Sequence, residues 1–434
     1  MTRQGTRGHD PYDSVPLPRE IRDAERIALL IGAAGMAACI VIWILGSAVR
    51  SWAPMADAFY RAWLFAWLLF LGASLGSMAL VMVHHLTGGQ WGLLVRRFGE
   101  SAAMVLPLLF ILSIPVLVGM RHLYPWARPH IEDPVVLHKR AYLNGGFFLI
   151  RVLLYFAIWI ATAWLLREGS LRHDRDGDEN IARRLRVVSA PGLVIYFITM
   201  SFASVDWIMS MEPRWYSTVF GFVVTMGQAV TGLCVMIVTL ALLRRLPPFK
   251  SVLRRNHLND LGNFLFTCVI LWAYNSFAQL LVQWMGNMTQ DIGWYVKRTS
   301  GTWRVLAALL IFLDFLVPFV LLLMRNFKRR AELMLWLCVG LLIMRAIDLF
   351  WMVAPAGDEP YPNFRWGALL IGLAALAGIG GLWTAAYLRN LGGHPLMPLG
   401  DRVPVVIAPS DELSPEHTVA PHDAEIGKSS TALA

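Results

Sequence analysis

Apolar residues dominate ten long stretches of this chain, and shorter polar segments that carry most of the charge separate them. Each stretch has about 18–24 residues, which matches a hydrocarbon core of about 30 Å at about 1.5 Å per helical residue. The pattern therefore predicts an all-α integral membrane protein with about ten transmembrane helices. The predicted spans are 27–49, 62–83, 102–119, 147–166, 191–211, 219–242, 262–282, 304–324, 333–353 and 367–387.

The segments outside these spans predict the domain organisation and the orientation. Residues 1–26 form a polar N-terminal segment, residues 27–387 the ten-span membrane domain, and residues 388–434 a mobile tail rich in Pro, Gly and charge. If the N-terminus is cytoplasmic, the cytoplasmic side holds more than twice as many Lys and Arg as the other side. Because Lys and Arg favour the cytoplasmic side, both termini are expected there.

The composition supports a membrane protein and excludes several kinds of site. Hydrophobic residues make up 57% of the 434 residues and charged residues only 15%, against about 25% charged in soluble domains. The net charge of +9 comes from Lys and Arg between the spans, so it gives no reason to expect nucleic-acid binding. The four Cys lie far apart inside spans, without a CxxC or CxxCH motif. We predict no disulfide, no metal site and no catalytic residue in this chain.

The two halves of the chain show a weak internal echo. Asp206 of the fifth span precedes Pro213 by the same spacing that separates Asp348 of the ninth span from Pro355. The echo predicts two four-helix bundles, spans 2–5 and spans 6–9, with spans 1 and 10 as peripheral helices; a chance match is the alternative. A duplication of four helices would preserve orientation and place the symmetry axis along the membrane normal.

Ionisable residues lie inside several spans, where each costs about 2.5–3.5 kcal/mol on insertion scales and marks an ion, proton or substrate path by default. The orientation places most of them toward the outer leaflet, with further candidates at the outer rim. The set predicts a hydrated path that accepts protons and releases them outward, with Asp206 as the first candidate. The alternative is that Arg–Asp pairs only tie the helices together. The predicted proton path consists of Asp206, Glu212, Arg151, Asp348, Arg345, Asp314, His138 and Lys139.

Glycine, proline and histidine predict further local features. Gly72 and Gly76 form a GxxxG motif in the second span, which predicts close contact with another helix. Pro107 and Pro115 are expected to kink the third span. None of the 11 His lies deep in a span and no iron–sulfur motif is present, so no haem or Fe–S cluster is expected on this chain.

Three further motifs are distinctive: SVDWIMSMEPRWYST at 204–218, the turn at 87–92, and YLNGGFF at 142–148, followed by Arg151. They resemble the membrane subunits of alternative complex III, a quinol:cytochrome c oxidoreductase, which are related to the polysulfide-reductase (NrfD-like) membrane anchors. The resemblance covers roughly residues 25–390 and includes the ten-span plan. It is greatest to the second of the two large quinone-binding-type subunits of that complex.

The resemblance implies a place in a bacterial inner-membrane complex that oxidises quinol near its outer face. Electrons would pass to iron–sulfur and multihaem cytochrome c subunits, which bind the haem and the Fe–S clusters, and then to a cytochrome c or a terminal oxidase. This chain would lie beside a second NrfD-like membrane subunit and membrane lipids, and would supply a proton path. The family positions carried over to that path are Asp206, Glu212, Arg151, His138 and Lys139.

A quinone headgroup needs partners for two carbonyls and an apolar, aromatic slot. The residues expected to form such a slot are Asp206, Trp207, Phe147, Phe148 and Tyr155, and ordinary packing of aromatic rings is the alternative. Two roles fit the resemblance. Either this chain binds quinol productively, or it is a proton conduit with a closed pocket and only its paralogous partner binds quinol.

Two readings from other classes compete with this one. A stand-alone secondary transporter or ion exchanger would also use intramembrane charges and an internal repeat. A membrane transferase with a lipid-linked donor fits less well. The longest outer loop, about 120–146, offers only Glu132 and Asp133 as acidic metal ligands.

Overall fold

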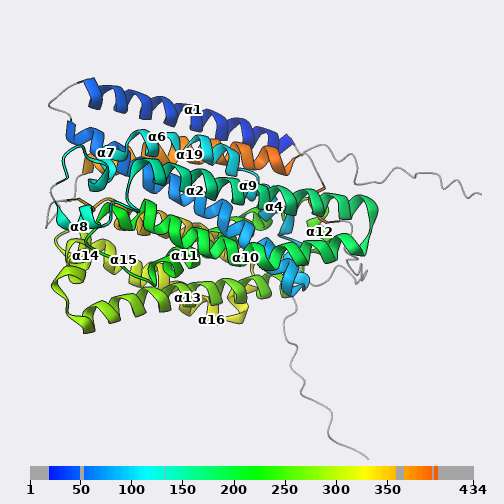
Figure 1. Ribbon diagram of the computed structural model, residues 1–434. Coiled ribbons are helices and arrows are strands. Elements are labelled where there is room, and N and C mark those ends of the chain that lie inside the picture. The colour runs from blue at the N-terminus through cyan, green and yellow to red at the C-terminus, as the bar shows by residue number, and fades with distance from the viewer. Residues whose placement is uncertain (1–18, 49–52, 132, 358–365, 393–394, 399–434) are drawn as a thin grey trace, which may run out of the picture. The chain divides into compact units, whose positions relative to one another are not determined.

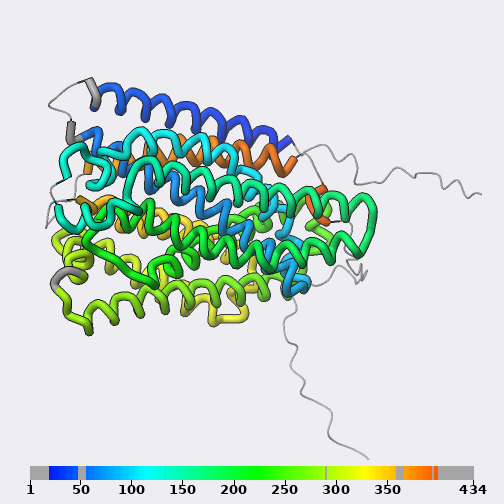
Figure 2. Tube along the Cα trace, in the orientation of Figure 1, coloured from blue at the N-terminus to red at the C-terminus, as the bar shows by residue number. Residues whose placement is uncertain are grey.

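The computed structural model describes residues 19–48, 53–131, 133–357, 366–392 and 395–398, and every regular element in these ranges is a helix. Ten helices or helical runs are long and apolar enough to cross a membrane, which confirms the predicted all-α class and the number of spans. They run alongside one another (Figure 1; Figure 2). The spanning elements are α1 (Arg19–Ala48), α2 (Ala53–Thr87), α4–α6 (Arg96–Ala103, Leu106–Ile111 and Ile114–Val118), α9 (Gly145–Asp176), α10 (Glu179–Trp207), α11 (Phe220–Leu243), α13 (Arg255–Gly286), α15–η4–α16 (Trp303–Leu309, Leu310–Leu316 and Val317–Leu323), α18 (Ala331–Val353) and α19 (Trp366–Leu391).

Short helices occupy the connections between these elements. They are α3 (Gln90–Leu93), α7 (Met120–Leu123), η2 (Pro125–Ala127), α8 (Pro134–His138), η3 (Met209–Met211), α12 (Phe249–Val252), α14 (Thr289–Thr299) and α17 (Arg325–Lys328). Two of them, α14 and α17, contribute to the sites described below.

Several helices extend beyond the predicted apolar spans. The first begins at Arg19, inside the segment 1–26 that the sequence assigns to the polar N-terminus, and α19 ends at Leu391 rather than at 387. Hydropathy marks only the part of a helix that lies in hydrocarbon, whereas the backbone hydrogen bonds continue into the polar region. Residues 1–18 and 399–434, which hold most of the predicted terminal segments, lie outside the described residues.

The third span is broken at both of its prolines, as predicted. A new helix begins at Leu106 with Pro107 in its first turn, and another begins at Ile114 with Pro115 in its first turn. Proline has no backbone N–H and its ring clashes with the preceding turn, so the regular hydrogen-bond ladder stops at each proline. The span therefore consists of α4, α5 and α6 rather than one straight helix.

The helix α2 lies at the centre of the membrane domain. Of its most apolar 18-residue window, 94% is buried, and it packs on α1, α4, α10, α11, α18 and α19. A Cβ atom at Gly76 would lie 1.8 Å from the backbone oxygen of Gln228 on α11, and one at Gly232 would lie 2.4 Å from the backbone nitrogen of Ser77. The helix contact predicted from the GxxxG motif is therefore confirmed, and its partner is α11.

The helices α1 and α19 form the most extensive helix pair and lie side by side in Figure 1. A Cβ atom at Gly35 would lie 2.3 Å from the backbone nitrogen of Gly378, so the two backbones touch. The division of the other spans into two four-helix bundles stays a prediction. Helices of spans 2–5 pack on one another, as do those of spans 6–9, but α2 also packs on α11 and α18 across the predicted boundary.

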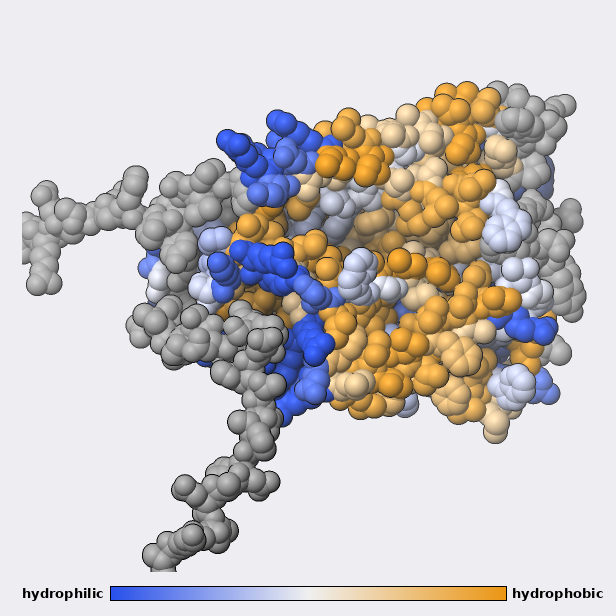
Figure 3. All heavy atoms as spheres, turned by 180° about the vertical axis from the view of Figure 1, so that it is seen from behind, coloured by the Kyte–Doolittle hydropathy of each residue, from blue (hydrophilic) through white to orange (hydrophobic). Residues whose placement is uncertain are grey.

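The surface agrees with a surrounding bilayer. Figure 3 shows an apolar middle zone with hydrophilic side chains toward both ends of the helices. Large apolar side chains point outward along many spans, for example Leu30 at 70% exposed, Val282 at 68% and Trp336 at 70%. Apolar surface of this extent requires a nonpolar environment.

We predict that Gly76→Ala destabilises the protein by about 1–3 kcal/mol, because the added methyl group overlaps the α11 backbone, which cannot move aside as a side chain can. The measurement is thermal unfolding of the purified protein in detergent. Gly340→Ala in α18 is the matched control, since an added Cβ there meets nothing within 4 Å. Equal melting temperatures for the two variants would contradict the close contact of α2 and α11.

Candidate functional site

The first candidate centre is an ion pair that joins α9 to α10. Asp206 lies in the last turn of α10 and is fully buried, and Arg151 near the start of α9 is buried as well. The guanidinium donates from Nε to Asp206 Oδ2 and from Nη2 to Oδ1, both at 2.8 Å. This bidentate geometry sets one cation against one anion and gives each carboxylate oxygen a charged donor.

Aromatic side chains enclose this pair. Tyr155 donates its hydroxyl to Asp206 Oδ2 at 2.9 Å, and the ring centre of Trp207 lies 6.1 Å from that of Tyr155. Trp207, Tyr155 and Phe148 are buried, whereas Phe147 is 41% exposed. Of the predicted quinone slot, Tyr155 thus binds the carboxylate and Phe147 lies against the Arg151 guanidinium, whereas Phe148 packs on Tyr124 and Trp126. The buried rings pack against one another and against their neighbours. Their role in binding quinone stays a prediction.

The second candidate centre lies between α18 and η4. Arg345 pairs with Asp314 of η4 and with Asp348, one turn further along α18, with 3.3 Å between Nη2 and Asp348 Oδ2. All three side chains are buried, and the Arg345 guanidinium lies 4.0 Å from the ring centre of Trp272. Two carboxyl groups share one cation here. Charge balance in a low-dielectric interior therefore favours a proton on one of the two carboxyl groups.

A local widening of the helix positions Asp314. The eighth span changes from an α-helix to a π-helix over Leu310–Leu316 and returns to an α-helix at Val317. Pro318 lies four residues after Asp314 and has no N–H, so it cannot donate the α-helical hydrogen bond to the Asp314 carbonyl. A π-helix shifts the hydrogen bonds by one residue, and such segments occur frequently at functional sites.

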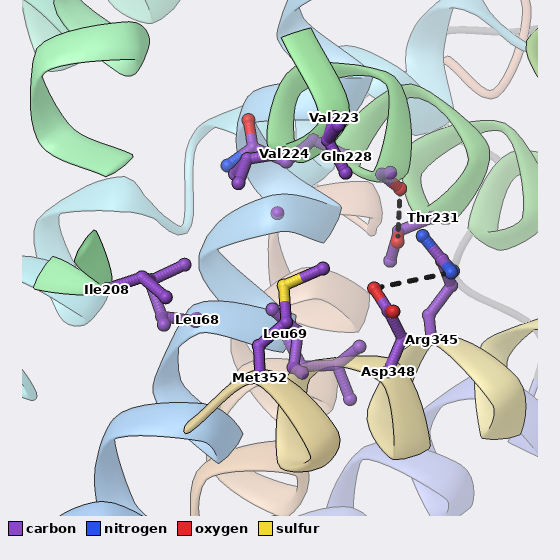
Figure 4. Close-up of a pocket in the computed structure, with 13 residues that line it drawn as sticks. Leu68, Leu69, Ile208, Val223, Val224, Gln228, Thr231, Arg345, Asp348 and Met352 are labelled. Carbon is purple, nitrogen blue, oxygen red and sulfur yellow. Dashed lines mark hydrogen bonds and ion pairs between the residues drawn. The ribbon is translucent and has the colours of Figure 1, made fainter. Parts of the chain in front are cut away.

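A cavity adjoins the second centre. Its lining includes Gln228 and Thr231 of α11, Arg345 and Asp348 of α18, and Ile208 at the end of α10 (Figure 4). The volume open to the centre of a water molecule is about 20 Å³, and a single water needs about 10–15 Å³ by this measure. The cavity is therefore of the size of a water molecule and too small for a quinone headgroup.

A third group of charges lies at the end of α10. Glu212 accepts from Arg298 Nη1 at 2.9 Å and pairs with Lys297 at 3.4 Å, and both cations belong to α14. Arg298 is 1% exposed and also donates to the backbone oxygen of Met352 on α18 at 2.6 Å. Burial lowers the pKa of Arg298, and the negative charge of Glu212 opposes that effect. The group fastens α14 to the ends of α10 and α18.

The remaining predicted site residues lie on the same side of the spans as Glu212. Lys139 donates from Nζ to the backbone oxygen of Pro213 at 2.6 Å, and His138 is exposed at the end of α8. The eight residues of the predicted proton path are thus divided among the Arg151–Asp206 pair, the Arg345 centre, the Glu212 group and this loop.

The predicted site residues did not include Gln228, Lys297 and Arg298. Gln228 lies mid-span, where its side-chain amide accepts from the Tyr196 hydroxyl at 2.7 Å. A polar amide inside an apolar span was a usable signal. Arg298 gave none, because a basic residue between two predicted spans is expected at the surface until packing shows that it is buried.

These features define a multi-pass integral membrane protein with ion pairs and a water-sized cavity inside its helical core. Within the described residues, no group of three or more His, Cys, Asp or Glu has the arrangement of a metal site. The chain matches no model of a known protein family, and no curated protein matches it.

We predict that Arg151→Met lowers the free energy of unfolding by about 3–5 kcal/mol, because it leaves the buried Asp206 carboxylate without its cation. Combining it with Asp206→Asn should cost less than the sum of the two single substitutions. The measurement is a double-substitution cycle of denaturant unfolding in detergent micelles.

The control for this cycle is Arg172→Met. Arg172 forms an exposed i,i+4 pair with Glu168 at 2.9 Å on the same helix, and such pairs contribute about 0.3–0.5 kcal/mol. Additive costs for the two substitutions at the buried pair would show that Arg151 and Asp206 do not depend on one another.

Proposed function

We propose that this chain is a membrane subunit of a respiratory quinol-oxidising complex of the alternative complex III type, in which it supplies a proton path. The Arg345 centre is the proton-carrying site of the proposal. Electrons travel on partner subunits that carry Fe–S clusters and haem c, and a second NrfD-like subunit and membrane lipids surround the chain. The motif at 204–218, with its Asp206 and Glu212, supports the choice of complex.

One observation carries the proton path. The Arg345 centre has one more carboxyl group than it has cations, and its Asp348 lines a cavity that can hold water. A site of this kind holds an exchangeable proton, because the charge left by deprotonation is costly inside the membrane. Water in the cavity would give that proton a route to and from Asp348.

The other centres have different roles in this proposal. The Arg151–Asp206 pair is balanced in charge and saturated with hydrogen bonds, so it holds α9 and α10 together and is a poorer proton carrier than the Arg345 centre. The Glu212 group anchors α14 where protons would leave toward the outer side. Quinol could bind next to Asp206 only if the aromatic rings around this residue move. If they do not, the paralogous subunit would be the one that binds quinol.

We predict that Asp348→Asn lowers the rate of quinol-driven turnover by about 10²-fold, the lower end of the contribution of a proton-transferring side chain, or lowers the number of protons released per quinol. The amide keeps the size of the carboxyl group, so the subunit should still assemble. The measurement is quinol oxidation and proton release by the purified complex in vesicles.

The control variant for Asp348 is Glu332→Gln. Glu332 lies on the same helix, but its side chain is 68% exposed and pairs with Arg244 near the helix start. Turnover and proton yield should be unaffected there. A well-assembled Asp348→Asn complex with wild-type values of both would remove the Arg345 centre from the mechanism.

The assignment to a complex has its own test. We expect a tagged chain, purified from native membranes under mild conditions, to bring with it a large iron–sulfur subunit and the visible absorbance of haem c. A colourless single chain that stays folded would contradict the respiratory complex. Transport by that lone chain in vesicles would then favour the transporter, for which the π-helix and the water-sized cavity would form the ion site.

A further inference from the structure

A cluster of basic side chains lies where α17 packs against the first turns of α13. Lys328 of α17 is only 7% exposed. Its aliphatic stem crosses α13 at Gly262, where an added Cβ would lie 2.8 Å from both Cγ and Cδ of the lysine. The ammonium group donates to the Asn263 side-chain oxygen. The lack of a side chain at residue 262 therefore lets the lysine lie flat on α13 and fixes the position of its charge.

Side-chain amides line α13 opposite these cations. Asn256, Asn259 and Asn263 are spaced by three and four residues, so they share one face of the helix. Arg329, which directly follows α17, lies with Nη2 3.5 Å from the Asn256 side-chain oxygen. The Nε atom of Arg329 and the Oδ1 atom of Asn259 are buried and have no hydrogen-bond partner within the described residues. The cluster therefore has one hydrogen-bond donor and one acceptor that no group in the described ranges satisfies.

The charge of this cluster is not balanced by an ion pair within the part of the chain that the structure describes. Within the described residues, no carboxylate forms an ion pair with Lys328, Arg325 or Arg329, although Asp260 lies exposed on the same part of α13. The buried cations Arg151, Arg298 and Arg345, in contrast, all have carboxylate partners.

The surroundings of Lys328 disfavour its charged form. Burial lowers the pKa of Lys328, and the nearby charge of Arg325 lowers that pKa further. A buried cation without a counter-ion is costly, so an anion beside Lys328 would stabilise the site.

The surroundings identify the kind of anion. Val320, Leu323 and Met324 directly precede the cluster at the end of the eighth span and are 50%, 57% and 54% exposed. This surface continues the lipid-facing side of α16 up to the basic side chains. An amphiphile with a phosphate group at the level of Lys328 and acyl chains along α16 meets both parts at once. Basic pockets between transmembrane helices bind anionic lipid headgroups in this way.

We propose that the cluster of Arg325, Lys328 and Arg329 beside the Asn256–Asn259–Asn263 face binds the phosphodiester group of an anionic phospholipid. The lipid would join the start of α13 to the connection between α16 and α18, and the helices on either side of that connection, η4 and α18, carry the Arg345 centre. This site is independent of the proposed respiratory function, because it depends only on the charges and unused polar atoms of the cluster.

The test uses the purified full-length protein, stripped of lipid in detergent and mixed with defined lipids. Native mass spectrometry should show that phosphatidylglycerol is retained at least about fivefold more than phosphatidylcholine of the same acyl chains, as expected for about 1 kcal/mol per cation. Phosphatidylglycerol should also raise the melting temperature, and inorganic phosphate should not. Equal retention of the two lipids, or equal stabilisation by inorganic phosphate, would overturn the proposal.

Variants test whether the retention of phosphatidylglycerol depends on this cluster. Lys328→Met keeps the stem that packs on Gly262 but removes the charge, and Arg325→Gln changes an exposed side chain that carries no packing. Each should lower the retention of phosphatidylglycerol about fivefold. Arg184→Gln, an exposed arginine at the start of α10, is the matched control and should bind as the wild type does. Wild-type retention by both Lys328→Met and Arg325→Gln would overturn the site. An equal loss in Arg184→Gln would overturn it too, because the loss would then reflect a general effect of surface charge.

Discussion

The cost of placing charge in hydrocarbon constrains this structure more than any other interaction. An isolated ion inside the membrane would be unstable, so the Arg151 and Arg345 side chains are set against carboxylates from another helix or another turn. Arg151 meets Asp206, and Arg345 meets Asp314 and Asp348. The helices must pack closely enough for these side chains to meet. The glycine contact between α2 and α11 brings these two helices together beside the cavity that Arg345 and Asp348 line.

The two intramembrane centres differ in stoichiometry, and that difference determines what each can do. A single cation against a single anion, fixed by two parallel hydrogen bonds, is a strong tie between helices and resists a change of protonation. One cation against two carboxyl groups leaves a proton to be shared, and a small water-sized cavity beside it makes exchange of that proton possible. The two centres therefore differ in charge balance although the residues involved are of the same types.

Much of the fold could be predicted from the sequence, because apolar length, proline and close-packed glycine act locally. The ten spans, the breaks at Pro107 and Pro115, and the contact at Gly76 all follow from rules that need no knowledge of the neighbouring helices. The division into two bundles cannot be derived from such local rules, because it depends on which helices pack most extensively on one another.

The pairing of the charges could not be predicted from spacing. Arg151 and Arg304 begin the same tripeptide, Arg-Val-Leu, near the starts of the fourth and eighth spans, so a repeat of the two halves would match them. Arg304 is instead exposed and donates to the backbone oxygen of Thr299, while Arg345 takes the buried position. The π-helix that aims Asp314 at Arg345 is a local adjustment around Pro318, and hydrophobic periodicity does not report it. The burial of Arg298 under α14 depends on tertiary packing alone.

The central claim is that Asp314 and Asp348 together hold one exchangeable proton, and infrared difference spectroscopy tests it most directly. Spectra of the purified complex, recorded before and after addition of quinol, report buried protonated carboxyl groups through their C=O stretching band. The account predicts such a band in the wild type, its shift or loss on turnover, and its absence in Asp348→Asn but not in Asp206→Asn. A wild-type spectrum without the band, or a band that persists when Asp314 and Asp348 are both replaced by Asn, would contradict the account.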